Sequence, residues 1–397
     1  MDAEDIEARL KLNAELDTKA AQTPSTGLTL RERWRKTMYF QKVDQIPNFE
    51  FGYWAETLPE WHKQGLPETI TTWDEAYVYF GIENWRWAPA NVGHMLPDFG
   101  KKEISRDDKY LVYQDPDGAI KRINLQGHKS IPQHIRFHLT DRKAWEEDYK
   151  PKLQAGANRL PNTWPELVKQ YQRRDYPLCV ARGSLVGYLR DWMGFEHIAV
   201  TVIEDPEWLE EMVEHICVLI CTMLEKACKD VEFDFGAGWE DICFNSGPIV
   251  GVNFMRDVVM PRYKRISDVL VQHGCGISWT DCDGNILPVL DSFWGGGLNC
   301  CFPIEINAGS DPFEIRRRYP SMRLQGGFCK MCLRQDKAAV RKQLESLIPL
   351  VKEGGYIPSV DHLVQADAKL DLYKYYLKLK REIFGVGGTP QYDESKI

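Results

Sequence analysis

Residues 275–285 read CGISWTDCDGN, an apolar run that ends in two carboxylates and a Gly-Asn turn. Side chains alternate across a strand, so Asp281 and Asp283 would share one face while Cys282 points to the other. Asp, Gly and Asn also form turns, and such a cluster is also typical of a plain strand end. The same unit, an apolar run followed by polar residues, recurs along the chain, and this recurrence predicts the fold.

Short apolar runs alternate with amphipathic helices from about residue 176 onward. The expected strands cover residues 178–181, 231–235, 276–279, 298–302, 322–324 and 356–358. The helix expected over 206–229 has Asp205 as its N-cap and Pro206 at its first position, and its apolar residues recur every three or four positions. Repeated βα units predict a parallel sheet with right-handed crossovers, either open or closed into a barrel.

The first third of the chain is expected to add α and β elements to this sheet. Apolar spacing predicts a helix from 28 to about 42 and then a strand over 46–51. A hairpin is predicted within 108–125, where two strands flank the turn sequence DPDG at 115–118. Residues 1–26 are polar and are expected to form either a helical arm on a neighbouring subunit or a disordered tail.

The composition bounds the class of protein. With 43% hydrophobic residues and 13 Trp, the chain of 397 residues can bury a large core, and no apolar run is long enough to span a membrane. A formal net charge of -8 argues against nucleic acid as a partner. The N-terminus shows no secretory signal and the 11 cysteines fit reduced thiols, so a soluble cytoplasmic protein is expected.

Polar residues follow each expected strand. The clusters are Arg182-Gly183, Trp239-Glu240-Asp241, Asp281 to Asn285, Pro303-Ile304-Glu305, Gly326 to Lys330 and Ser359 to His362. In a (β/α)8 barrel the carboxyl ends of the strands meet at one mouth, where catalytic groups gather. Several clusters in register therefore predict a single functional site.

Several short motifs also occur in a characteristic order. They are FEFGYW at 49–54, WED at 239–241 with GP at 247–248, MPRYKR at 260–265, DCDGN at 281–285, PIE at 303–305, GG at 326–327, and GGYIP at 354–358 with DH at 361–362. In this order and spacing they resemble the uroporphyrinogen decarboxylase superfamily, within it the methyltransferase-like, corrinoid-associated branch. The resemblance implies a (β/α)8 TIM barrel with its active site in the mouth, expected over residues 44–387. The residue pattern adds an N-terminal helical arm over 1–43, the β-hairpin as an insertion and a flexible tail over 388–397.

Departures from the family bear on the reaction. Residues 47–54 contain no arginine, whereas decarboxylases of the superfamily grip the carboxylates of a tetrapyrrole there, so porphyrinogen decarboxylation is not expected. Zinc methyltransferases of the superfamily have a His-x-Cys pair at the strand end where this chain has Asp281 and Asp283. With His362 as third ligand, these residues are expected to form an oxygen-rich site for zinc or another divalent metal, or to bind no metal.

The resemblance implies a corrinoid-dependent methyltransferase. It would demethylate a small methylated compound, for instance a methoxylated one, by methyl transfer to a corrinoid protein. The implied partners are the methyl donor and the corrinoid-binding protein, and a homodimer is compatible with the sequence. Two other functions stay open: a metal-assisted decarboxylase or lyase of a small acid, which needs no corrinoid, and a ligand-binding barrel without catalysis.

Roles are predicted for eleven residues. The expected catalytic residues are Glu50, Glu240, Asp281, Asp283 and Lys330. The expected substrate-binding residues are Trp54, Trp239, Arg182, Glu305 and Tyr263, and the expected metal ligands are Asp281, Asp283 and His362. For Glu50 and Glu240 the choice is between a buried acid with a raised pKa and a structural salt bridge. For Glu305 a hydrogen bond between strand ends is the alternative, and for Lys330 it is a solvated side chain.

Four cysteines leave a separate question. Cys329-x-x-Cys332, together with Cys300 and Cys301, could form a four-thiolate zinc site or a redox pair. Cys300 and Cys301 are adjacent on an expected strand and would face opposite ways, which argues against one shared site. The roles of these thiols stay open.

Overall fold

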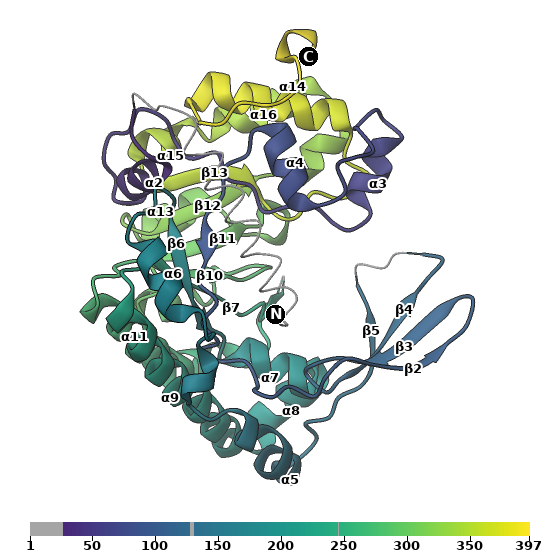
Figure 1. The fold of residues 1–397 in the computed structure, drawn as a ribbon, viewed down its shortest axis with the longest axis vertical. Helices are drawn as coiled ribbons and strands as arrows, with labels where there is room; N and C mark the ends of the chain where they lie inside the picture. Colours follow the sequence, from purple (N-terminus) through teal and green to yellow (C-terminus); the bar gives the residue numbers. More distant parts are fainter. Residues whose placement is uncertain (1–26, 128–130, 245) are drawn as a thin grey trace.

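The computed structural model describes residues 27–127, 131–244 and 246–397. Its centre is a curled parallel sheet with helices on its outer face (Figure 1). A core of buried side chains lies within the curl of the sheet. In the order of the sheet, the strands are β1 Arg86–Trp87, β6 Leu178–Gly183, β7 Phe235–Trp239, β10 Ser278–Asp281, β11 Cys300–Ile304, β12 Arg323–Phe328 and β13 Tyr356–Val360. All of these strands pair in parallel, as repeated βα units predict.

Helices connect the strands and cover the outer face of the sheet. The α-helices are α2 Leu30–Met38, α3 Thr57–His62, α4 Trp73–Phe80, α5 Arg142–Ala144, α6 Trp164–Tyr171, α7 Val186–Met193, α8 Phe195–Glu204, α9 Pro206–Asp230, α10 Gly251–Phe254, α11 Met260–Gln272, α12 Leu290–Gly295, α13 Pro312–Arg318, α14 Lys337–Ser346, α15 Ile348–Glu353 and α16 Leu370–Phe384. Short 3-10 or π-helical turns are η1 Trp145–Tyr149, η2 Lys150–Lys152, η3 Ala157–Arg159, η4 Met255–Val259, η5 Ile306–Ala308, η6 Lys330–Arg334 and η7 Glu394–Lys396. The N-cap of α9 is Asp205, as predicted, and its side chain accepts a hydrogen bond from the Trp208 N–H.

The concave face of the sheet is filled by side chains rather than open. Its core includes Cys179, Phe235, Ala237, Ile277, Trp279, Cys300, Phe302 and Ile357. Trp279 stacks on Phe302 with ring centroids 4.6 Å apart. Helix α2 closes the amino ends of the strands, because its Trp34 belongs to the same core and stacks on Phe235. A functional site is therefore expected at the other end of the sheet, where the strands have their carboxyl ends.

The strand expected over residues 46–51 does not form. Ile46 and Tyr53 each make one isolated bridge instead. Pro47 offers no N–H to a ladder and Gly52 takes a φ of 124°, so neither supports a regular strand. Within the described residues, the central sheet has seven strands where a (β/α)8 barrel would have eight.

Strand boundaries also differ from expectation. The strand expected over 231–235 lies over Phe235–Trp239, and β6 and β10 extend far enough to include Arg182 and Asp281. The two-residue strand β1 was not expected, because so short a segment shows no hydrophobic period. These shifts decide which face each polar side chain occupies, since neighbours on a strand point to opposite sides.

A second sheet stands away from the body (Figure 1). Its antiparallel strands are β2 Lys102–Arg106, β3 Tyr110–Gln114, β4 Ile120–Asn124 and β5 Gln133–Arg136, and a small pair joins β8 Cys243–Phe244 to β9 Gly247–Pro248. Strands β3 and β4 confirm the predicted hairpin. At the C-terminus, Tyr392 packs against Tyr79 with ring centroids 5.3 Å apart. No described helix is long and apolar enough to cross a membrane, and the arm or tail expected over 1–26 lies outside the described residues.

Candidate active site at the carboxyl ends of the strands

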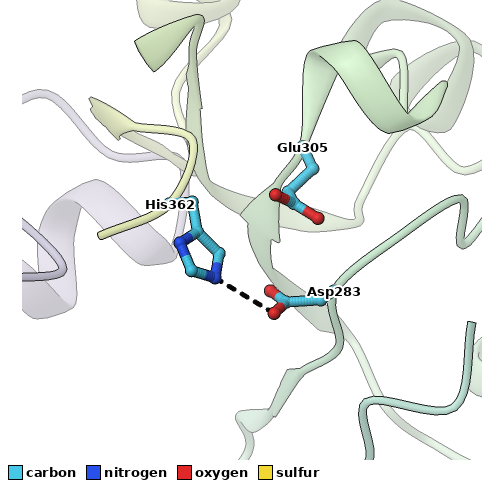
Figure 2. Close-up of side chains that lie close together, drawn as sticks. All are labelled: Asp283, Glu305 and His362. Carbon is cyan, nitrogen blue, oxygen red and sulfur yellow. Dashed lines mark hydrogen bonds and ion pairs between the residues drawn. The ribbon is translucent and has the colours of Figure 1, made fainter. Parts of the chain in front are cut away.

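Five of the predicted site residues converge where the parallel strands end. Asp281 is the last residue of β10 and Asp283 follows it, Glu305 follows β11, Lys330 follows β12 and His362 follows β13. Trp239, Asp281 and Phe302 lie opposite one another in the sheet register, so the strand ends are at one level. Figure 2 shows the side chains of Asp283, Glu305 and His362 pointing toward one another.

Asp283 and His362 form the pair at the centre of the site. Asp283 Oδ2 lies 3.1 Å from His362 Nε2 (Figure 2). The imidazole is clamped by aromatic rings: Trp54 stacks on it at 5.7 Å and Phe51 meets it edge-on at 5.4 Å. Asp283 Oδ1 and His362 Nδ1 are buried and have no hydrogen-bond partner among the described residues. Each residue therefore retains one atom that can bind a ligand.

Glu305 and Lys330 form an ion pair beside these two residues. Glu305 Oε1 accepts a hydrogen bond from Lys330 Nζ at 2.8 Å, and its Oε2 accepts one from the Gly284 N–H at 2.9 Å. The backbone of Lys330 is held in turn, because its N–H donates to Asp361 Oδ1 at 2.8 Å. Asp361 is fully buried, and this burial raises the pKa of its carboxyl to about 7.

Asp241, Asp281 and Asp283 form a group of three carboxylates next to this pair. One carboxylate oxygen of each lies within 4.8 Å of one from each of the others. Asp241 reaches this position with a φ of 46°, which is rare for a residue other than glycine. Its Oδ1 accepts a hydrogen bond from the Asp283 N–H at 3.1 Å, which ties the ends of β7 and β10 together.

The crowding of acids perturbs their protonation. Burial raises the pKa of Asp281 well above its usual value, and the charges of Asp241, Asp283 and Glu305 add to this shift. Burial, followed by the charge of Asp283, raises the pKa of Asp241 to about 6, although Arg190 opposes the shift. The Asp281 side chain accepts no hydrogen bond from another described side chain or N–H group, and it keeps its proton where an ordinary aspartate has lost it.

Two overlapping sets of side chains could hold a cation. One is Asp283, Glu305 and His362, and the other is Asp241, Asp281 and Asp283, each with its ligand atoms within 4.8 Å of one another. The predicted combination of Asp281, Asp283 and His362 is not one of these sets. Asp281 belongs to one set and His362 to the other, and Asp283 belongs to both. The set with His362 offers one nitrogen and carboxylate oxygens, a combination that zinc and other divalent ions accept.

Glu240 lies outside this site. Its carboxylate accepts hydrogen bonds from the Ser184 hydroxyl and from the N–H groups of Leu185, Val186 and Gly187, at 2.9 to 3.0 Å. These groups lie at the start of helix α7. The Glu240 side chain therefore caps that helix, because it accepts hydrogen bonds from N–H groups that have no partner within the helix. Glu240 follows Trp239 on the chain and points to the other side, toward the helices.

Glu50, Arg182 and Tyr263 are also placed elsewhere. Glu50 pairs with Lys380 at 2.6 Å in the interior. Arg182 is fully buried, donates from Nε to the Trp279 carbonyl at 3.0 Å and lies over the ring of Tyr263. Neither Arg182 nor Tyr263 appears in a contact with Asp281, Asp283, Glu305, Lys330 or His362 within the described part of the chain.

Sequence reasoning missed Asp241, Asp361 and Phe51 as residues of the site. Asp241 and Asp361 belong to clusters that follow strands. In each cluster the sequence predicted the neighbouring residue instead: Glu240 in place of Asp241, and His362 in place of Asp361. Phe51 belongs to the segment expected as a strand and gave no signal of its own. The position of Asp241 depends on its positive φ, which a sequence pattern does not reveal.

No protein-family model and no curated protein sequence matches the chain. Among solved structures, the chain is similar to a methyltransferase from Methanosarcina mazei at 12% sequence identity, with a TM-score of 0.60 over 90% of this chain and 99% of that chain. It also matches a protein described as a vitamin-B12-independent methionine synthase from Listeria monocytogenes, at 10% identity over 55% of this chain and 68% of that chain, but the TM-score of 0.29 is too low to carry an argument. At this identity the first likeness concerns the fold alone: the chain has a methyltransferase-like α/β fold.

Proposed function

We propose that the chain is a methyltransferase of the corrinoid-associated branch of the uroporphyrinogen decarboxylase superfamily, and that it demethylates a small methyl ether. The observation that carries this proposal is the convergence of Asp283, Glu305 and His362 at the strand ends, with Asp281 beside them. The likeness in fold to a methyltransferase is compatible with the same class of reaction, but the site residues carry the proposal because a fold alone does not specify a reaction.

The proposal includes a barrel-type scaffold in which residues 46–53 stand where an eighth strand would be. The Glu83 N–H donates to the Asn48 carbonyl at 2.9 Å, on the side of β1. The Val360 N–H donates to Glu50 Oε2 at 3.0 Å, on the side of β13. These contacts support a segment that bridges the two edges of the sheet without forming a ladder.

Removal of a methyl group from an ether leaves an alkoxide, which must receive a proton because it is a poor leaving group. We assign this proton to the Asp281 carboxyl, which lies among carboxylates and has no cationic partner in the described structure. As the methyl–oxygen bond breaks, its electron pair stays on the oxygen and the Asp281 proton moves to that oxygen. A corrinoid in the Co(I) state on a partner protein supplies the nucleophile that takes the methyl group.

The set of Asp283, Glu305 and His362 would hold a zinc or another divalent ion. A bound ion would polarise an oxygen atom of the substrate. The chain itself prepares this set: the aromatic clamp of Trp54 orients His362, and Lys330 with the Gly284 N–H orients Glu305. Trp54 also contributes an apolar wall for the methyl donor.

The test compares leaving groups. Purified protein, a reduced corrinoid and a panel of methyl ethers and quaternary methylammonium compounds are assayed for methyl transfer. Asp281→Asn should lower the rate with ethers by about 10²- to 10⁴-fold. It should change the rate with quaternary ammonium donors little, because a neutral amine leaves without a proton.

The matched control is Asp268→Asn, which removes an acidic side chain from an exposed ion pair with Lys264 on helix α11 and should leave the rates unchanged. No methyl transfer from any donor would refute the proposal. Equal loss with both kinds of donor would refute the role of Asp281 as the acid.

A further inference from the structure

Cys329 and Cys332 lie directly beside the candidate site, at the first and last positions of the turn that leads into η6. The Cys332 N–H donates to the Cys329 carbonyl at 3.0 Å, which closes the turn that begins η6. A four-residue turn closed by this bond holds its first and last Cα atoms less than about 7 Å apart, and the two thiols are hydrogen-bonded to each other. A disulfide bond requires a Cα separation in this range.

Cys329 is prepared as the nucleophile of the pair. Its sulfur accepts a hydrogen bond from Asn307 Nδ2 at 3.2 Å. The hydrogen bond from the Cys332 thiol, followed by the Met331 N–H and Asn307, lowers the pKa of Cys329 to about 6. The same hydrogen bond raises the pKa of Cys332, and burial, the charge of Cys329 and the carboxylates of Asp361 and Asp336 act in the same direction.

Other cysteines offer a contrast. Cys300 and Cys301 have no exposed surface, whereas Cys329 and Cys332 keep 9% and 8% exposure. Burial raises the pKa of Cys300 well above its usual value and that of Cys301 to about 12. Thiols of this kind are inert, since the thiolate is the reactive form.

We infer that Cys329 and Cys332 form a redox pair that a hydroperoxide converts to an intramolecular disulfide. The Cys329 thiolate attacks an oxygen of the hydroperoxide, the O–O bond breaks, and the products are a sulfenic acid on Cys329 and water or an alcohol. The Cys332 thiol then attacks the sulfenic sulfur, the S–S bond forms and water leaves. Two thiols lose two electrons, and the hydroperoxide gains them.

The position of Lys330 links this pair to the site. Lys330 lies between the two cysteines, its N–H is bonded to Asp361 and its ammonium group to Glu305. Closing a disulfide across residues 329–332 tightens this turn and displaces Lys330 from Glu305, one of the side chains assigned to the cation. This effect on the site rests on the proposed function, whereas the disulfide itself does not.

The test begins with the full chain, reduced with dithiothreitol and then exposed to hydrogen peroxide. Free thiols are blocked with iodoacetamide and peptides are mapped by mass spectrometry. The expected result is a Cys329–Cys332 disulfide that dithiothreitol reverses. Cys332→Ser should stop at the sulfenic acid, trapped on Cys329 by dimedone, and Cys329→Ser should leave Cys332 unmodified.

A disulfide at Cys217–Cys221 alone, whose sulfurs lie 4.0 Å apart within α9, would overturn the inference. Unmodified or irreversibly oxidised Cys329 would also overturn it. Zinc binding to the reduced and oxidised protein is measured separately, and oxidation should weaken it about tenfold. Unchanged zinc binding with an intact disulfide would refute only the link to the site, and the double variant Cys329→Ser, Cys332→Ser should show no effect of peroxide on zinc.

Discussion

The ammonium group of Lys380 lies 2.6 Å from the carboxylate of Glu50, and their side chains are 0% and 1% exposed. The Tyr376 hydroxyl donates to the same carboxylate oxygen at 2.7 Å. Burial lowers the pKa of Lys380, while Glu50 opposes this shift. With both charges paired in the interior, Glu50 is best explained as part of the structure that fixes α16 against residues 46–53.

Glu50→Ala should therefore destabilise the protein. Removing one partner of a buried ion pair leaves the other charge uncompensated, at a cost of about 3–5 kcal/mol in the free energy of unfolding. Urea unfolding followed by circular dichroism measures this cost. Asp268→Ala, which breaks an exposed ion pair with Lys264, is the matched control and should change stability by less than about 1 kcal/mol. Wild-type stability in Glu50→Ala would contradict the structural role.

Glu240→Gln should weaken helix α7. Every contact of the Glu240 carboxylate in this cap is with a donor, three of them N–H groups, so the amide nitrogen of glutamine would face another donor. The expected cost is about 1–3 kcal/mol in the free energy of unfolding. Glu314→Gln, at a surface ion pair, is the control. If Glu240→Gln were as stable as the wild type but had lost its activity, the original catalytic assignment would regain support.

The strand-end acids show how far sequence patterns reach. Asp281 and Asp283 were predicted to share a face, and their carboxylates do lie together. Glu240 was placed with them because the preceding strand was expected about four residues early, over 231–235 rather than Phe235–Trp239. Once Trp239 is seen on the strand, alternation turns Glu240 outward. The order of the βα units can thus be predicted from the sequence, because each unit shows the same pattern of an apolar run followed by an amphipathic helix.

Contacts between distant segments are what the sequence did not reveal. Glu50 meets Lys380 across most of the chain, and nothing local marks either residue as a partner of the other. Which residues join Asp283 in a cation set likewise depends on the direction of the Glu305 side chain. Hydrogen bonds from the Gly284 N–H and from Lys330 fix that direction. Such pairings follow from tertiary packing, not from spacing along one strand.

Zinc affinity should separate the two possible cation sets. If Asp283, Glu305 and His362 hold the ion, His362→Ala and Glu305→Gln should each weaken zinc binding at least about tenfold by isothermal titration calorimetry. Asp281→Asn and Asp241→Asn should change it by less than about threefold, and they serve as matched controls within the same cluster. Equal losses in Asp281→Asn and His362→Ala would instead favour the combination expected from the sequence.

A pH-dependent test is available at Asp117, in the turn between β3 and β4 and outside both cation sets. Burial, followed by the charge of Asp115, raises the pKa of Asp117 to about 6 from an ordinary 3.8. The folded state thus binds this proton more tightly than the unfolded state, so stability falls as the pH rises from about 4 to about 6. At neutral pH the full penalty is present, up to about 3 kcal/mol.

Asp117→Asn removes the ionisable group and keeps the turn N–H bonded to Asp115 Oδ1 at 2.9 Å. The variant should gain stability over the wild type at pH 7 to 8, by up to about 3 kcal/mol, and the gain should vanish below about pH 4, where Asp117 is protonated in both states. Urea unfolding at several pH values measures the difference. Asp107→Asn is the opposite control, because hydrogen bonds from the Tyr110 and Lys109 N–H groups lower the pKa of Asp107, so loss of its charge should destabilise the protein at neutral pH. A gain that stayed constant from pH 4 to pH 8 would show that the raised pKa is not its cause.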